Sequence, residues 1–230
     1  MRTYELPMSP ISVQNPDNSK KITVTVKVSD SKTPYQPTGN FEHLPIYQKL
    51  IESSEFTKRP FDPKGVFKPE DIAEHFIRGP TLYNPNCIQY GSSHFNETDN
   101  VLVMLLKLGT KISGHKGLVH GGFISGLFDE ILSEAFHTTV YKKRLHGFTA
   151  SLKVDYRQPL PHNIPVAIGV RTIKTEGRKY FLKAELYDAS VEVDDGHDSI
   201  SGLLGRATLF AEAEALFIIP KDVWEKRLDQ

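Results

Sequence analysis

The middle of the chain contains a strongly apolar stretch with helical periodicity, between residues 121 and 138. Its apolar side chains cover more than half of a helix circumference, which is typical of a buried helix rather than one lying on a surface. The rest of the circumference is a polar stripe with members four residues apart: Ser125, Asp129, Ser133 and His137. A single layer of sheet would leave this stripe uncovered, so it needs solvent, a ligand or a second subunit.

Shorter apolar runs, with the pattern of half-buried or buried strands, lie on both sides of this helix. The predicted strands span residues 82–91, 100–108, 148–156, 165–175, 179–187 and 203–210. Residues 101–106 are apolar without interruption, so we expect both faces of that strand to be covered. One helix wrapped by an antiparallel sheet of five or six strands is an α+β fold.

The N-terminal part of the chain has a different pattern, in which five prolines and many polar residues interrupt residues 1–43. Residues 21–28 alternate as a half-buried strand does, so they either add a strand to a sheet edge or form a mobile arm. Helical signals follow at residues 44–51, and again from Pro69 to about Ile77. We therefore divide the chain into an N-terminal extension (1–43), a helical lead-in (44–80) and a main domain (81–230).

Charge and composition narrow the function classes. The 28 basic residues balance 28 acidic ones, which argues against a nucleic-acid binder, and Cys87 alone forms neither a disulfide nor a cysteine zinc cluster. The longest apolar run is too short for a transmembrane segment. The first 35 residues have no apolar signal-peptide core and are too acidic for a typical mitochondrial presequence. We expect an intracellular protein, cytoplasmic by default, with a mitochondrial location as the alternative.

Two glycines, Gly121 and Gly122, stand at the start of the predicted helix. His120 precedes them, and six residues after them come the acids Asp129 and Glu130. This His-Gly-Gly, six residues and an acid resemble the motif of the hotdog-fold acyl-CoA thioesterases. The likeness is to the phenylacetate-pathway-like group, which includes the mammalian mitochondrial long-chain acyl-CoA thioesterases.

Two further segments carry the same resemblance. Residues 148–159 (FTASLKVDYRQP) resemble the strand after the family's helix, with the hydroxyl residue at Thr149. Residues 176–179 (EGRK) resemble a hairpin of the mammalian members. The resemblance covers about residues 81–220 and implies a hotdog fold, an acyl-CoA substrate, no metal or redox cofactor, and a homodimer or homotetramer.

The chemistry of thioester hydrolysis suits these residues. Negative charge develops on the thioester carbonyl oxygen, and N–H groups at a helix N-terminus stabilise it. Gly121 lies at that terminus, where the missing side chain lets a substrate approach the backbone. A carboxylate must then activate water or attack the carbonyl, and Asp129 is suited to either role. Helical periodicity allows Glu130 equally, so the family spacing is what selects Asp129.

The remaining candidates follow from the resemblance. His120 would fix the loop that presents Gly121, and the Thr149 hydroxyl would hold the attacking water or orient Asp129. Gly122, Arg178 and Lys179 are the candidate substrate-binding residues, the two cations being placed to grip a coenzyme A phosphate. The alternatives are that Thr149 is an ordinary β-branched strand residue and that the hairpin cations are routine surface charges. No metal site is expected, because His115 and His120 lack zinc-ligand spacing.

Helix geometry predicts how many chains a site needs. Gly121 and Asp129 are eight residues apart, or about 12 Å along a helix, too far for one thioester carbonyl to meet both. Two antiparallel helices about a two-fold axis would place Gly121 of one chain near Asp129 of the other. We therefore expect an obligate dimer with two shared sites. The alternatives in function are a hotdog hydratase or dehydratase acting on acyl thioesters, and a non-catalytic acyl-CoA-binding protein.

Overall fold

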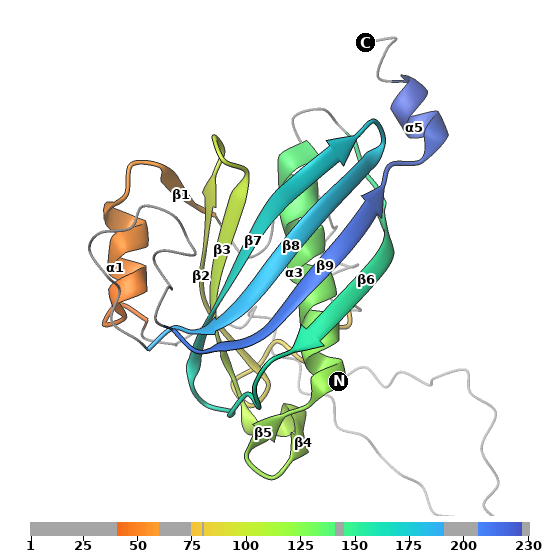
Figure 1. Cartoon of the computed structure of the whole chain (residues 1–230). Helices are drawn as coiled ribbons and strands as arrows, with labels where there is room; N and C mark the ends of the chain where they lie inside the picture. The colour runs from red at the N-terminus through yellow and green to blue at the C-terminus, as the bar shows by residue number, and fades with distance from the viewer. Residues whose placement is uncertain (1–40, 60–74, 80, 141–144, 191–206, 227–230) are drawn as a thin grey trace, which may run out of the picture. The chain divides into compact units, whose positions relative to one another are not determined.

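The computed structural model describes residues 41–59, 75–79, 81–140, 145–190 and 207–226. Among these residues, seven strands form one antiparallel sheet in the order β1-β2-β3-β7-β8-β9-β6, which curves around the long helix α3 (Gly121–Val140) (Figure 1). The strands are β1 (Phe56–Arg59), β2 (Ile88–Asn96), β3 (Val101–Leu108), β6 (Phe148–Tyr156), β7 (Pro165–Glu176), β8 (Lys179–Asp188) and β9 (Leu209–Ile218). The predicted α+β fold, a helix wrapped by an antiparallel sheet, is confirmed.

Helix α3 is buried for the reason that its periodicity suggests. The predicted apolar face packs into the main core, where Phe128, Ile131, Leu132 and Phe136 are at most 1% exposed. The ring of Phe136 stacks on Phe217 of β9, with ring centroids 4.8 Å apart. The helix begins at Gly121, as predicted, and continues two residues beyond the predicted end. None of the described helices is long and apolar enough to cross a bilayer.

The helical lead-in contains a strand as well as a helix. The predicted helix over 44–51 is α1 (Pro45–Glu52), with proline in its first turn. Strand β1 then pairs with β2 and brings the sheet to seven strands, beyond the five or six predicted. Apolar side chains of and near α1 pack on Val103 and Leu105 of β3, opposite the face that meets α3. Both faces of β3 are thus covered, as predicted.

Strand β2 corrects the sequence prediction, which placed a strand at residues 82–91. Residues before Cys87 form turns instead: the Asn84 side-chain amide donates to the Thr81 carbonyl (3.0 Å), and the Asn86 N–H donates to the Asn84 side chain (2.9 Å). The true strand extends to Asn96 through buried polar residues, Ser92, Ser93 and His94 among them. Their polarity, and a register shift between Tyr90 and Ser92, concealed the strand.

Strand β9 is the second correction, because it runs from Leu209 to Ile218, whereas the predicted strand ended at residue 210. The first four residues of that prediction, 203–206, lie outside the described part of the chain. Its alternation uses small apolar and acidic residues, with Ala211, Ala213 and Ala215 buried and Glu212 and Glu214 between them. Alanine and glutamate favour helices in isolation. Pairing with β8 on one side and β6 on the other overrides that preference.

Two expected elements cannot be compared with the structure. The alternating stretch at 21–28 and most of the helix expected after Pro69 lie outside the described residues. The remaining predicted strands, at 148–156, 165–175 and 179–187, correspond to β6, β7 and β8.

Candidate active site

The start of α3 is held by a short hairpin. Strands β4 (Ser113–His115) and β5 (Leu118–Val119) pair after the 3-10 turn η1 (Thr110–Ile112), and Gly117 supplies the left-handed backbone (φ 83°) of the turn. The N–H of His120 donates to the Ile112 carbonyl (2.9 Å), and that of Val119 to the Leu160 carbonyl (2.9 Å). These two bonds hold the backbone of Val119 and His120, the residues directly before the helix, in place.

His120 caps the first turn of α3. Its Nδ1 accepts a hydrogen bond from the Gly122 N–H at 2.9 Å, satisfying one of the amides that a helix start leaves without an intrahelical acceptor. A neutral ring that accepts at Nδ1 carries its proton on Nε2, so the exposed edge of His120 presents a donor. A Cβ at position 122 would lie 3.0 Å from His120 Cε1, so the ring occupies the space beside the glycine.

The Gly121 amide comes just before this cap. Within the described part of the chain, the Gly121 N–H has no acceptor, whereas its carbonyl accepts from the Tyr156 hydroxyl at 2.8 Å. Gly121 is half-buried, and the atoms nearest to a Cβ placed there would be those of the Tyr156 phenol, at 3.5 Å. The amide at the start of the helix is therefore positioned and available to bind an anionic oxygen.

Asp129 lies two turns further along α3 and contacts β6. The Thr149 hydroxyl donates to Asp129 Oδ1 at 2.8 Å. Thr149 is exposed and Asp129 half-buried, so the pair lies at the surface where the sheet ends. A register shift between Thr149 and Ser151 marks a β-bulge in β6, a feature that commonly re-aims side chains beside functional sites.

Glu130, the other acid that periodicity allowed, is held elsewhere. Its carboxylate pairs with Arg78 Nε and lies 3.7 Å from His75 Nε2. Arg78 also binds Glu134 (3.0 Å), whose second oxygen accepts from Ser93 Oγ (3.2 Å). Burial raises the pKa of Glu134, and the charge of Arg78 opposes that shift. This buried network anchors residues 75–79 to α3 and leaves Asp129 as the carboxylate that faces β6.

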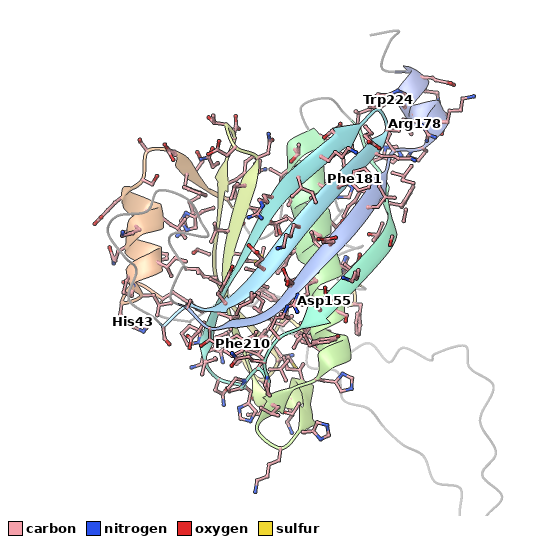
Figure 2. All side chains as sticks on the ribbon, in the orientation of Figure 1. His43, Asp155, Arg178, Phe181, Phe210 and Trp224 are labelled. Atoms are coloured by element: carbon pink, nitrogen blue, oxygen red, sulfur yellow. The ribbon has the colours of Figure 1, made fainter. Side chains whose placement is uncertain are left out.

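The hairpin cations lie at the far end of the sheet. Arg178 Nη1 donates to the Ile219 carbonyl at 2.7 Å, tying the β7–β8 turn to the end of β9. Figure 2 shows Arg178 and Trp224 at this end, where α5 (Lys221–Lys226) follows β9. Lys179 is exposed, and it shares the Ile218 register position with Phe148, next to Thr149. These cations therefore lie at the end of β6 that carries Thr149, not at the end that carries Tyr156.

Within one chain the acid and the amide are not brought together. Gly121 and Asp129 are separated by eight residues of one helix, about 12 Å. Each is held by a different end of β6, Gly121 by Tyr156 and Asp129 by Thr149. In the described residues, no group of three or more His, Cys, Asp or Glu side chains is placed to hold a metal ion.

Comparison with known proteins shows which family this chain resembles. Residues 116–193 match the Thioesterase superfamily. The acyl-coenzyme A thioesterase THEM4 of Xenopus laevis is 32% identical over 193 residues, which cover 76% of this chain and 74% of that protein. This chain belongs to the thioesterase superfamily. THEM4 of Bos taurus is 29% identical over 183 residues, covering 78% of this chain and 67% of that protein.

The predicted resemblance and hotdog fold of this thioesterase-superfamily chain are therefore confirmed. Coverage of its other relatives is less complete: a mitochondrial membrane protein of Saccharomyces cerevisiae, FMP10, is 30% identical over 97 residues, and the chain spans 40% of its length. The family match includes every candidate site residue, from His120 to Lys179.

Three residues that lie on or contact helix α3 around the candidate site were not predicted from the sequence. Arg78 reaches α3 from a segment 52 residues away, a contact without a local signal. Ser125 was placed on the polar stripe but given no role. Tyr156 lies seven residues after Thr149, and an odd spacing in a regular strand puts side chains on opposite faces. The bulge after Thr149 reverses the alternation, so both side chains reach α3.

Proposed function

We propose that this chain is an acyl-CoA thioesterase that hydrolyses an acyl thioester to a free carboxylate and coenzyme A. The observation that carries the proposal is the hydrogen bond from Thr149 to Asp129 of α3. The first amide of the same helix, that of Gly121, lacks an acceptor in the described residues. Relatives that carry the name acyl-coenzyme A thioesterase support the substrate class.

The reaction uses Asp129 as the general base. Thr149 donates to Oδ1, which leaves Oδ2 to take a proton from water as the water oxygen attacks the thioester carbon. The carbonyl oxygen becomes an oxyanion that the Gly121 N–H stabilises. When the tetrahedral intermediate collapses, the carbon–sulfur bond breaks. The leaving thiolate of coenzyme A takes the proton that Asp129 had removed from water. Direct attack by Asp129, through a mixed anhydride that water then cleaves, is the alternative route.

The site is completed by a second copy of the chain. β6 is the last strand of the sheet and pairs only with β9 in the described residues, and its Phe148 and Tyr156 are 66% and 52% exposed. The polar stripe of α3 is only half-buried beside it. A two-fold arrangement along this side would bring Gly121 of one protomer to Asp129 of the other and cover the apolar rings.

Mixing two inactive variants tests the shared site. Asp129→Asn removes the base, and Gly121→Pro removes the amide at a position where a helix tolerates proline. In a mixed dimer, one site would combine the intact Gly121 of the first variant with the intact Asp129 of the second. We expect mixing to restore up to about a quarter of wild-type activity, because half of the dimers would be mixed with one intact site each. No recovery from mixed dimers isolated with two different tags would disprove the sharing.

Thiol release from a panel of acyl-CoAs of increasing chain length tests the activity itself. Stoichiometric release of coenzyme A and free acid supports the hydrolase. Addition of water to an enoyl-CoA, without thiol release, would identify a hydratase instead. Tight binding of acyl-CoA with neither product would identify a non-catalytic binding protein.

We infer an intracellular, mitochondrial location from the fungal relatives. One is FMP10, and a second, from Candida albicans, carries the name of a mitochondrial protein and is 25% identical over 119 residues. Fractionation of cells expressing the full chain with a C-terminal tag tests the compartment. Recovery in the cytosol alone would favour the cytoplasmic alternative.

A further inference from the structure

We propose that Tyr156 is a positioning residue for the thioester site: its phenol holds the Gly121–Gly122 peptide and so aims the Gly121 N–H at the substrate carbonyl. The inference rests on the proposed function, and it adds a residue that acts through the backbone of α3. Three hydrogen bonds at the start of the helix carry it, two between a side chain and the backbone and one between two side chains.

The hydroxyl groups of Tyr156 and Ser125 form hydrogen bonds whose donors can be assigned. Tyr156 donates to the Gly121 carbonyl (2.8 Å), and the two hydroxyl oxygens are 2.6 Å apart. A phenol has one proton, so Ser125 must donate to Tyr156 when Tyr156 donates to Gly121. The other Ser125 option, donation to the Gly121 carbonyl, is longer, at 3.3 Å. Ser125 therefore keeps the phenol oriented toward the carbonyl.

The Gly121–Gly122 peptide is held at both of its polar ends. Tyr156 binds its carbonyl, and His120 Nδ1 binds its N–H at 2.9 Å. Because a peptide unit is planar, holding these two atoms fixes the plane of the Gly121–Gly122 peptide. The Gly121 N–H belongs to the preceding peptide, whose His120 carbonyl accepts from the Ile124 N–H at 3.1 Å. With both planes held, rotation about the two backbone bonds of Gly121 that join them is restricted, and the Gly121 N–H keeps one direction. Two consecutive glycines have no side chains to restrict their backbone. An external restraint is needed for them to present an amide in one orientation.

Strand β6 thus supports both halves of the chemistry, but for different sites. Thr149 orients Asp129, and Tyr156 restrains Gly121, about 12 Å away along the same helix. In the proposed dimer, the Gly121 and the Asp129 of one chain serve different sites. Tyr156 must therefore act in the site that contains its own Gly121 and the partner's acid.

The first experiment replaces the phenol by Tyr156→Phe in the full chain. The Phe ring keeps the contact with Gly121, so folding and dimerisation should be unchanged. We expect kcat to fall about three- to tenfold with KM unchanged, since one hydrogen bond that positions the amide is lost. Tyr187→Phe is the matched control, because Tyr187 lies on β8 and packs near α1. Unchanged kcat in Tyr156→Phe, or a fall only in step with melting temperature, would overturn the proposal.

The second experiment uses the mixed dimers of Asp129→Asn and Gly121→Pro. Their one intact site takes its amide from the Asp129→Asn chain. Tyr156→Phe added to that chain should lower the recovered activity by the same three- to tenfold, whereas added to the Gly121→Pro chain it should have no effect. Equal effects from both placements would show a general structural role and refute the assignment.

A readout independent of turnover separates this inference from the proposed function. Loss of the Tyr156 hydroxyl should speed hydrogen exchange of the Gly122 amide, observed by NMR, while exchange in the middle of α3 stays unchanged. If the wild-type chain releases no thiol, the proposed function fails and this exchange still tests the restraint. Unchanged exchange at Gly122 would refute it.

Discussion

The Thr149 hydroxyl donates a hydrogen bond to the Asp129 carboxylate at 2.8 Å, joining the edge strand β6 to the middle of helix α3. The bond occupies one carboxylate oxygen and leaves the other for water. Glu130, the adjacent acid, is instead paired with Arg78. The two neighbouring acids therefore lie in different environments, since Glu130 contacts a cation and Asp129 accepts from a neutral hydroxyl.

Replacing Asp129 by Asn should remove the base while keeping the size and the Thr149 contact. We expect turnover of acyl-CoA to fall by roughly 10²–10⁴, with the melting temperature nearly unchanged. Glu130→Gln is not a suitable control, because that carboxylate holds Arg78. Asp155→Asn is, since Asp155 lies on β6 and contacts Lys153 (2.8 Å). Full turnover in Asp129→Asn would remove this residue from the mechanism.

Thr149 should matter through its hydroxyl rather than its shape. Thr149→Val keeps the branched side chain on β6 and deletes the donor, whereas Thr149→Ser keeps the donor. We expect Val to lower kcat about tenfold or more, and Ser to retain most of it, because the hydrogen bond to a charged carboxylate is worth about 1.5–3 kcal/mol. Steady-state kinetics of the two variants decide the matter. Equal losses in both would mean that Thr149 acts through strand packing.

The buried network at Arg78 should carry stability rather than catalysis. Its side chain is 6% exposed and contacts Glu130 and Glu134, the latter 2% exposed. Arg78→Ala leaves buried carboxylates without a countercharge, which costs about 3–5 kcal/mol of unfolding free energy. Arg171→Ala, which removes an exposed cation 3.6 Å from Glu185, should cost less than about 1 kcal/mol, because Lys183 still pairs with that carboxylate at 3.0 Å. Urea denaturation of both variants measures the difference, and equal costs would contradict the assignment.

The local pattern of apolar and polar residues was sufficient to predict the elements whose side chains are buried at regular intervals. The apolar face of α3 and the two-faced apolar run of β3 were read correctly, since both patterns arise from packing on known faces. β9 was misplaced because Ala213 and Glu214 suit a helix locally and become a strand only by pairing with β6 and β8. The role of Tyr156 depends on a bulge, and that of Arg78 on a contact across 52 residues. Neither leaves a local signal.

His94 should make the fold sensitive to acid. It lies on β2 and is 1% exposed, with its ring centroid 6.1 Å from that of Tyr47 on α1. Its Nε2 is bonded to Ser92 Oγ (3.0 Å), and its Nδ1 is buried without a partner in the described residues. Burial, together with the nearby charge of Lys58, lowers the pKa of His94 to about 4. The pKa in the unfolded chain is about 6.5.

Between these two pKa values the unfolded chain binds the proton and the folded chain does not. The stabilisation is therefore complete above pH 6.5 and is lost as the pH falls toward 4, by about 2–3 kcal/mol at pH 4.5. Urea denaturation at pH 7 and at pH 4.5 measures this loss. The same comparison in His94→Phe and His94→Gln removes the His94 contribution while the carboxylates still titrate. If the loss of stability between the two pH values is as large in either folded variant as in the wild type, His94 is not its source.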